Sequence, residues 1–277
     1  MNILTTLVFI VAANANANTN ANANANANTN ANTNANANAN ANQCQLKAHQ
    51  IKAQYQLTFA QNQDHHADTH IHPPRTNQSQ LTLWRKGNTV AHQYQQTRIT
   101  EAWYLLANKQ IKPTRYFEQH QRGIEYQPGE NVHGKTESDW SYRQQLVSNQ
   151  LLQQLTLASE SGQGCQHQQS FKQTTPSGTL TLVWLPQLQL ISQFTWQTSQ
   201  STETWQLLDV THDSQQVDAF FDQLNQYQMT DYADIGDDHS DPFLTSMVTL
   251  GFVEHGASGF YDDKGNALSG SLSGHQH

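Results

Sequence analysis

The residues that could bind a transition metal are concentrated in the segment Asp64-His65-His66-Ala67-Asp68-Thr69-His70-Ile71-His72. Imidazole is a common ligand of zinc and copper, and carboxylates can complete the coordination shell. In an extended segment, three of these histidines would share a face with the two aspartates, and His65 would point the other way. The simpler interpretation is a solvated loop closed by Pro73-Pro74. We therefore expect His65, His66, His70 and His72 to bind zinc or copper weakly, and we assign no other cofactor.

A second cluster consists of the acidic residues Asp231, Asp234, Asp237, Asp238 and Asp241. Calcium favours clustered carboxylates, but the spacing does not match the EF-hand loop. Asp241 directly precedes Pro242, which is typical of a helix N-cap followed by proline at the first helical position. Asp237 and Asp238 would lie near the positive end of that helix. Helix capping is therefore the favoured role of this acidic loop, with calcium or a polar ligand as the alternatives.

Glu254 and His255 stand before a glycine-rich turn, Gly256-Ala257-Ser258-Gly259, and could suggest acid–base chemistry. The chain contains neither a GxSxG nucleophile motif nor an HExxH metal helix. We therefore assign no catalytic residue and expect no enzyme, while a hydrolase remains an alternative.

Cys44 and Cys165 are the two cysteines of the chain. In an oxidising compartment a pair of cysteines most simply forms one disulfide. The alternative is two unpaired buried thiols. A redox or zinc role is disfavoured because the chain has no CxxC motif.

The N-terminal region resembles an export signal followed by an Asn-Ala repeat, which is either a spacer or, as we favour, an expansion with no selected role. The apolar run Ile3 to Ala13 is too short to cross a membrane, which takes about twenty residues, but suits a signal peptide. We predict a signal peptide over residues 1–15, although no Lys or Arg precedes the run. From Asn14 to Asn42 the chain alternates Asn with Ala or Thr, which provides too little apolar surface to order residues 16–43. We expect a disordered linker there, a globular domain over 44–270 and a flexible tail over 271–277.

The composition limits the partners that the chain could bind. The formal net charge is −8, and charged residues make up 13% of the chain. A nucleic-acid-binding protein usually carries a basic face, which this balance disfavours. Beyond the signal region no apolar run approaches the length of a membrane span. We therefore expect a periplasmic or secreted protein that binds neither nucleic acid nor, as an integral protein, the membrane.

The elements that would position these residues are mostly strands. The segment 81–94 predicts a hairpin that turns at Lys86-Gly87-Asn88. The remaining strands are expected at 55–59, 98–106, 114–120, 123–126, 166–172, 179–185, 188–197 and 203–212. One helix is expected from a capping box at Thr136 and Asp139 to the glycines at 162 and 164. Others are expected over 217–227, capped by Asp213 or Ser214, and from Pro242 to Gly251.

This order indicates an α+β fold, with a largely antiparallel, curved β-sheet packed against helices on one side. The half-barrel layout resembles that of periplasmic lipoprotein carriers and their relatives, in architecture alone. The favoured function is a non-enzymatic exported protein that binds an apolar ligand or a periplasmic protein partner on the concave side of the sheet. Aromatic residues of the later strands could line that side: Trp184 beside Val183, then Phe194, Trp196 and Trp205. A transition-metal-binding protein that uses the His-rich loop is the second interpretation, and a hydrolase is the third.

Overall fold

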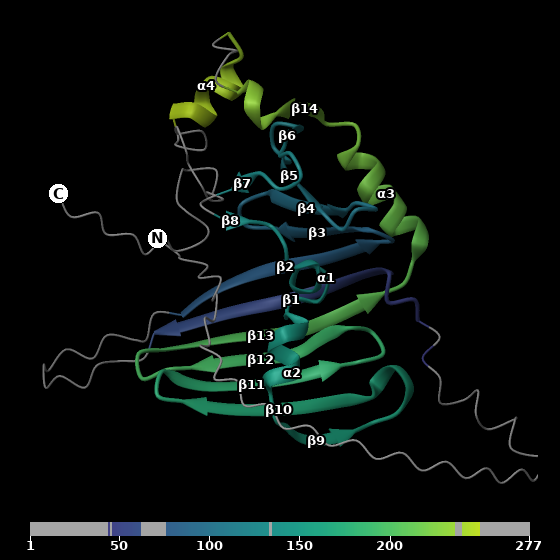
Figure 1. The fold of residues 1–277 in the computed structure, drawn as a ribbon, viewed down its shortest axis with the longest axis vertical. Coiled ribbons are helices and arrows are strands. Elements are labelled where there is room, and N and C mark those ends of the chain that lie inside the picture. The colour runs from purple at the N-terminus through teal and green to yellow at the C-terminus, as the bar shows by residue number, and fades with distance from the viewer. Residues whose placement is uncertain (1–43, 45, 62–75, 133–134, 236–239, 250–277) are drawn as a thin grey trace, which may run out of the picture.

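The computed structural model describes residue 44 and residues 46–61, 76–132, 135–235 and 240–249 (Figure 1). Within these ranges the chain forms a large open sheet of 12 strands, mostly antiparallel, and a few short helices. No helix in the described ranges is long and apolar enough to cross a membrane. The predicted class, a largely antiparallel sheet with helices, is thus observed in its coarse form.

The strands follow one another across the sheet in the order β14-β6-β5-β4-β3-β2-β1-β13-β12-β11-β10-β9. The first half of the sheet contains β1 (Gln50–Gln61), β2 (Thr76–Lys86), β3 (Thr89–Tyr94), β4 (Ile99–Leu105), β5 (Ile111–Phe117) and β6 (Arg122–Glu125). The second half contains β9 (Leu157–Ser161), β10 (Gln168–Thr175), β11 (Gly178–Leu185), β12 (Leu190–Gln197) and β13 (Ser201–Thr211). Strand β1 joins the halves because it pairs antiparallel with both β2 and β13.

Two further pairings complete the strand arrangement. Strand β14 (Gln228–Asp231) pairs parallel with β6, which local sequence patterns did not predict. Strands β7 (Asn131–Val132) and β8 (Lys135–Thr136) form a separate two-stranded sheet. The predicted hairpin between β2 and β3 is confirmed, and Gly87 at its turn has φ +59°, a conformation that favours glycine.

The predicted long helix before the second half of the sheet is wrong in two respects. The chain forms two short helices, α1 (Trp140–Gln145) and α2 (Asn149–Gln154), instead of one. Leu146 adopts a left-handed conformation with φ 63° and ends α1, and the hydroxyl of Ser148 then caps α2. Asp139 alone caps α1 by accepting a hydrogen bond from the backbone N–H of Tyr142. The segment before Gly162 is strand β9, so this glycine does not end a helix.

The other helices agree with the sequence prediction. Helix α3 (Ser214–Leu224) begins at Asp213, whose carboxylate accepts hydrogen bonds from the N–H groups of Gln215 and Gln216. Helix α4 (Pro242–Thr249) begins after Asp241. Two short 3-10 helices, η2 (Gly164–Gln166) and η3 (Tyr232–Asp234), stand before β10 and after β14.

The helices lie on both faces of the sheet, so the expectation that they cover one side is wrong. Trp84 and Arg85 are consecutive in β2 and therefore point to opposite faces. Trp84 stacks on Phe220 of α3 with ring centroids 4.0 Å apart. Arg85 donates to the backbone carbonyl of Gln144 in α1, at 2.6 Å. Each face consequently has its own hydrophobic core, one under α3 and the other under α1 and α2.

A disulfide joins Cys44 to Cys165, as the cysteine pair predicted, with 4.5 Å between the two Cα atoms. Cys44 precedes β1, and Cys165 lies in η2 between β9 and β10. The bond therefore connects the start of the described chain to the far edge of the sheet.

Candidate functional site

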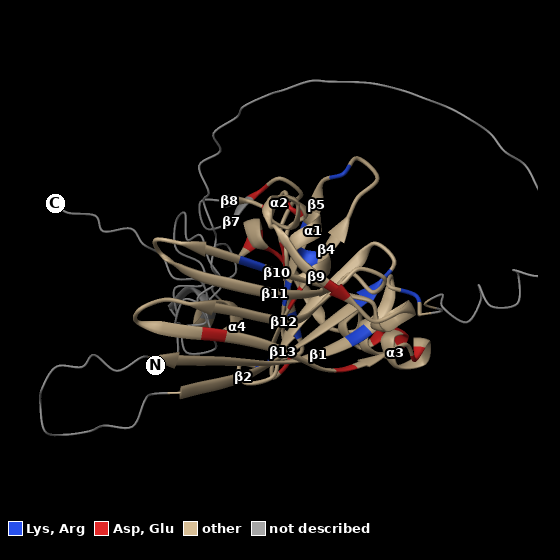
Figure 2. Ribbon diagram, turned by 90° about the horizontal axis from the view of Figure 1, so that it is seen from below, with Lys and Arg blue, Asp and Glu red and all other residues tan. Residues whose placement is uncertain are grey.

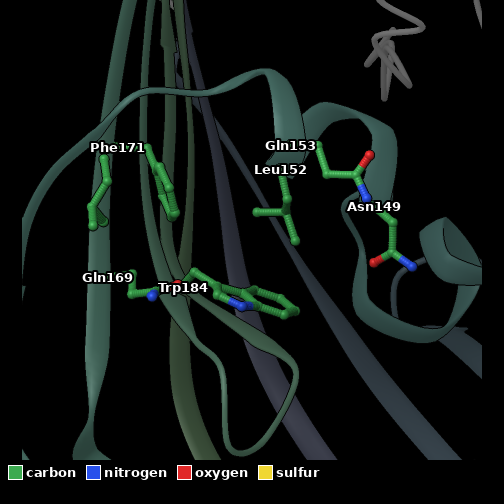
Figure 3. Close-up of a pocket in the computed structure, with 7 residues that line it drawn as sticks. Asn149, Leu152, Gln153, Gln169, Phe171 and Trp184 are labelled. Carbon is green, nitrogen blue, oxygen red and sulfur yellow. The ribbon is translucent and has the colours of Figure 1, made fainter. Parts of the chain in front are cut away.

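A pocket with a volume of about 370 Å³ lies between helix α2 and strands β9 to β11. Its lining residues are Asn149, Leu152, Gln153, Leu157, Gln169, Phe171 and Trp184. Figure 3 shows Leu152 pointing from α2 toward Phe171 and Trp184 of the sheet. The pocket thus has one wall from a short helix and one from three neighbouring strands.

The strand residues reach the pocket because side chains alternate along a strand and align across it. Gln169 pairs with Trp184 across β10 and β11, and Phe171 pairs with Leu157 across β10 and β9. Phe171 and Trp184 are buried, with 8% and 6% of their surface exposed. Leu157 retains 46% exposure. The two aromatic rings therefore form an apolar floor, and Leu157 lies closer to the solvent.

None of the seven lining residues is charged. Figure 2 shows few charged residues over the strands of this half of the sheet. The charged residues in strands β9 to β13 are Glu160, Lys172, Glu203 and Asp209. Lys172 follows Phe171 in β10 and therefore points to the opposite face. The pocket is accordingly an electrically neutral environment lined by four apolar side chains and three amide side chains.

Arg85 binds the end of helix α1, which precedes α2 in the chain. Its guanidinium donates to the backbone carbonyls of Ala48, Gln144, Leu188 and Gln189. Burial lowers the pKa of Arg85 to about 10, so that it stays protonated at neutral pH. One buried cation thus connects α1, the β11–β12 turn and the segment before β1.

A buried row of ionisable side chains crosses the same face of the sheet on strands β3 to β5. The strand register places His92 beside Glu101 and Glu101 beside Arg115. Each of the three is at most 5% exposed. Burial raises the pKa of the Glu101 carboxyl, although the charges of Arg115 and Arg143 partly counteract this. No single segment of the sequence contains this row, because its three members lie in three different strands.

Arg143 of α1 covers part of this row. Its guanidinium lies 4.2 Å from the centre of the Trp103 ring and donates to the Glu137 carboxylate at 2.9 Å. The Arg143 carbonyl oxygen lies 2.7 Å from His92 Nε2, so Nε2 carries the proton of this imidazole and donates it. Burial and the neighbouring charge of Arg143 lower the pKa of His92 to about 3. His92 is therefore neutral at physiological pH and holds α1 against the sheet.

The aromatic residues predicted to line a concave site divide between the pocket and the core. Trp184 lines the pocket, and Trp196 is buried in the core under α1 and α2. Phe194 and Trp205 are partly buried against that core, with ring centroids 5.5 Å apart. Val183 directly precedes Trp184 in β11. The sequence thus identified one of the lining residues and missed the amides of α2, because it predicted one continuous helix there.

Two of the three described members of the acidic cluster, Asp231 and Asp241, cap helices. Asp241 Oδ1 accepts hydrogen bonds from the N–H groups of Phe243 and Leu244, at 2.8 and 3.3 Å. Asp231 caps η3 by accepting from Ala233 N–H, and Asp234 belongs to η3 itself. The remaining members, Asp237 and Asp238, lie outside the described residues.

The metal-binding and acid–base candidates of the sequence lie in other segments of the chain. The predicted metal ligands His65, His66, His70 and His72 lie outside the described residues, as do Glu254 and His255. Among the residues that the structure does describe, no group of three or more His, Cys, Asp or Glu could hold a metal ion. Metal binding by the His-rich loop therefore remains a prediction.

No protein-family model matches the chain, and no curated protein is similar to it in sequence. Two solved structures of PNGF-II, in different crystal forms, are 8% identical and align with 65% of this chain at TM-scores of 0.30 and 0.31. The chain spans 31% of the PNGF-II chain. A domain named as an outer membrane lipoprotein-sorting protein, from Vibrio parahaemolyticus, is 5% identical. It aligns with 62% of this chain and 91% of its own, at a TM-score of 0.25. Similarity this low says nothing about the ligand or the activity of this chain.

Proposed function

We propose that this chain is an exported, non-enzymatic protein that binds an apolar ligand in the pocket under α2. The observation that carries the proposal is the composition of the lining: four apolar side chains, three amides and no charge. Small-molecule sites are typically concave, mostly apolar and provided with a few polar groups that orient the ligand. The volume of about 370 Å³ lies at the lower end of the usual range of about 300–1,000 Å³.

Export is proposed from two features of the chain. The disulfide between Cys44 and Cys165 suits an oxidising compartment. The apolar run and small residues at the N-terminus suit a signal peptide. Intact-mass measurement of the protein from its native host should find a mature chain that begins at or after Asn14. Retention of Met1 in the exported pool would contradict export by a cleaved signal.

The first test of ligand binding is native mass spectrometry of the protein, purified from the periplasm without chelator. An apolar small molecule should be retained and be released by denaturation. A retained metal ion or a partner subunit in its place would instead favour one of the other interpretations of the sequence.

A matched pair of variants then locates the binding. Leu157 and Leu208 are both exposed strand leucines, at 46% and 56%, and of the two Leu157 lines the pocket. The uncharged fluorophore N-phenylnaphthylamine should bind the natural chain saturably. Leu157→Gln should weaken that binding about fivefold, equivalent to about 1 kcal/mol of lost apolar contact. Leu208→Gln should leave it unchanged. Equal effects of the two substitutions would place the ligand elsewhere.

A further inference from the structure

The three amide side chains that line the pocket indicate what kind of head group its ligand carries. We infer that the pocket takes an uncharged amphiphile whose head group both donates and accepts hydrogen bonds, such as an alcohol or a primary amide. This inference rests on the proposed function, because it names the chemical class of the ligand at the same site. It follows from the hydrogen bonds of the amides, the positions of nearby charges and the volume.

The amide side chains that line the pocket retain complementary hydrogen-bonding groups. The carbonyl oxygen of Asn149 accepts from Gln145 Nε2, which leaves the Asn149 NH₂ group as a donor. The NH₂ group of Gln169 donates to Glu160, which leaves the Gln169 carbonyl oxygen as an acceptor. Gln153 stands four residues after Asn149 on α2, so the two share one helix face. The helix wall of the pocket therefore offers the Asn149 donor beside the Gln153 amide, and the Gln169 acceptor lies on the opposite, sheet wall (Figure 3).

Nearby charges give no support to an anionic head group, and the one carboxylate near the pocket that could attract a cation, that of Glu160, already has two partners. A buried carboxylate or ammonium is costly unless an opposite charge pairs with it. Glu160, which neighbours the pocket through Gln169, already accepts from that amide and lies 3.8 Å from His167 Nε2. Lys172 points to the opposite face of the sheet. A ligand carboxylate would thus find no cation among the lining residues and would lie near an acidic residue.

The volume sets the size of the ligand. A water molecule occupies about 30 Å³, and a pocket of about 370 Å³ therefore holds on the order of a dozen non-hydrogen atoms. A ten-carbon chain with a single head group has this size. The buried rings of Phe171 and Trp184 would contact the chain, and Asn149 and Gln153, which lie together on the α2 side of the pocket (Figure 3), would contact the head group.

The test compares four ten-carbon probes that differ in the head group: decanol, decanamide, decanoate and decylammonium. Each competes with N-phenylnaphthylamine for the natural chain at pH 7, below the concentration at which micelles form. Decanol and decanamide should displace the fluorophore at concentrations at least tenfold lower than the two charged probes. Equal or better competition by decanoate or decylammonium would overturn the inference, while the binding of apolar ligands would stand. Failure of the fluorophore and of all four probes to bind would instead contradict the proposed function.

A matched pair of variants tests the role of the amide. Gln153 lines the pocket and Gln154, the next residue of α2, does not. Both are exposed helix positions, where leucine is a good helix former. Gln153→Leu should weaken decanamide binding severalfold and leave the fluorophore bound as before, whereas Gln154→Leu should change neither. Equal decanamide binding by both variants would contradict a head-group contact at Gln153.

Discussion

Arg122 donates a hydrogen bond of 2.8 Å to the Asp241 carboxylate and so joins strand β6 to the first turn of helix α4. The other carboxylate oxygen of Asp241 caps that helix at Phe243 and Leu244. The Arg122 guanidinium also lies 4.8 Å from the centre of the Phe243 ring. One aspartate thus serves both as a helix N-cap and as an ion-pair partner.

Asp241→Ala should lower the free energy of unfolding by about 0.5–2 kcal/mol, the usual value of an N-cap. The bond to Arg122 and the capped N–H groups lower the pKa of the Asp241 carboxyl. Its contribution is therefore complete above the ordinary aspartate pKa and is lost as the pH falls through the lower pKa of the folded state. Denaturant unfolding at neutral and at acidic pH measures both effects.

Asp234→Ala is the control for Asp241, because Asp234 lies in η3, away from the start of α4. We expect it to cost less than Asp241→Ala, and we expect neither loss to change when calcium is added or chelated. Equal losses of stability that disappear with a chelator would show that the acidic loop holds calcium.

The disulfide between Cys44 and Cys165 should stabilise the fold strongly. The two cysteines are 121 residues apart in sequence, and closing a loop of that length contributes roughly 4–5 kcal/mol on the chain-entropy model. The double variant Cys44→Ser/Cys165→Ser should therefore unfold at much lower denaturant concentration. Alkylation of the protein from its native host without reduction should label neither cysteine. Two labelled thiols would refute the bond.

Local patterns in the sequence were sufficient to predict much of the sheet. The turn at Gly87, the strand alternation around it and the cap at Asp241 each depend on a few neighbouring residues, and the structure has all three. Leu146 shows where local patterns fail. Its neighbours continue a helical spacing of apolar residues, yet the chain turns there because Ser148 begins a second helix on the same core.

The pocket and the row of ionisable side chains depend on contacts distant in sequence. Asn149 and Gln169 line the same pocket because β9 folds back along β10, and the single helix predicted from the sequence did not allow for this strand. His92 and Glu101 are isolated ionisable residues in their strands, and neither forms a recognisable motif. Once the β3–β4 register is known, however, their cross-strand pairing follows directly. A sequence search for buried pairs of ionisable residues would therefore need the hairpin registers first.

His92→Gln should make the fold less sensitive to acid. The folded pKa of His92 is lowered to about 3, so the unfolded chain binds a proton below about pH 6.5 that the folded chain does not. Stability is therefore lost as the pH falls. Between pH 6.5 and 5, the natural chain should lose on the order of 1–2 kcal/mol more than the variant, because the slope rises from half of 1.36 kcal/mol per pH unit at pH 6.5 toward the full value at pH 5. A glutamine Nε2 could still donate to the Arg143 carbonyl.

The exposed His49 provides the control for His92. His49→Gln should leave the difference in stability between pH 6.5 and 5 as in the natural chain. If His92→Gln and His49→Gln behave alike, the imidazole of His92 is protonated in the fold, and α1 does not depend on a neutral donor at that position.

Glu101→Gln should have the opposite effect on the pH dependence. Burial raises the pKa of Glu101, so the folded chain retains a proton that the unfolded chain has already released. Stability of the natural chain should therefore fall as the pH rises from the ordinary glutamate pKa through the higher pKa of the folded state. Glutamine carries no such proton, and the variant should gain stability relative to the natural chain over that range. Asp222→Asn, at an exposed position on α3, is the control and should show no such gain. If instead the variant loses stability relative to the natural chain as the pH rises, Glu101 is ionised in the fold and stabilises it as the partner of Arg115.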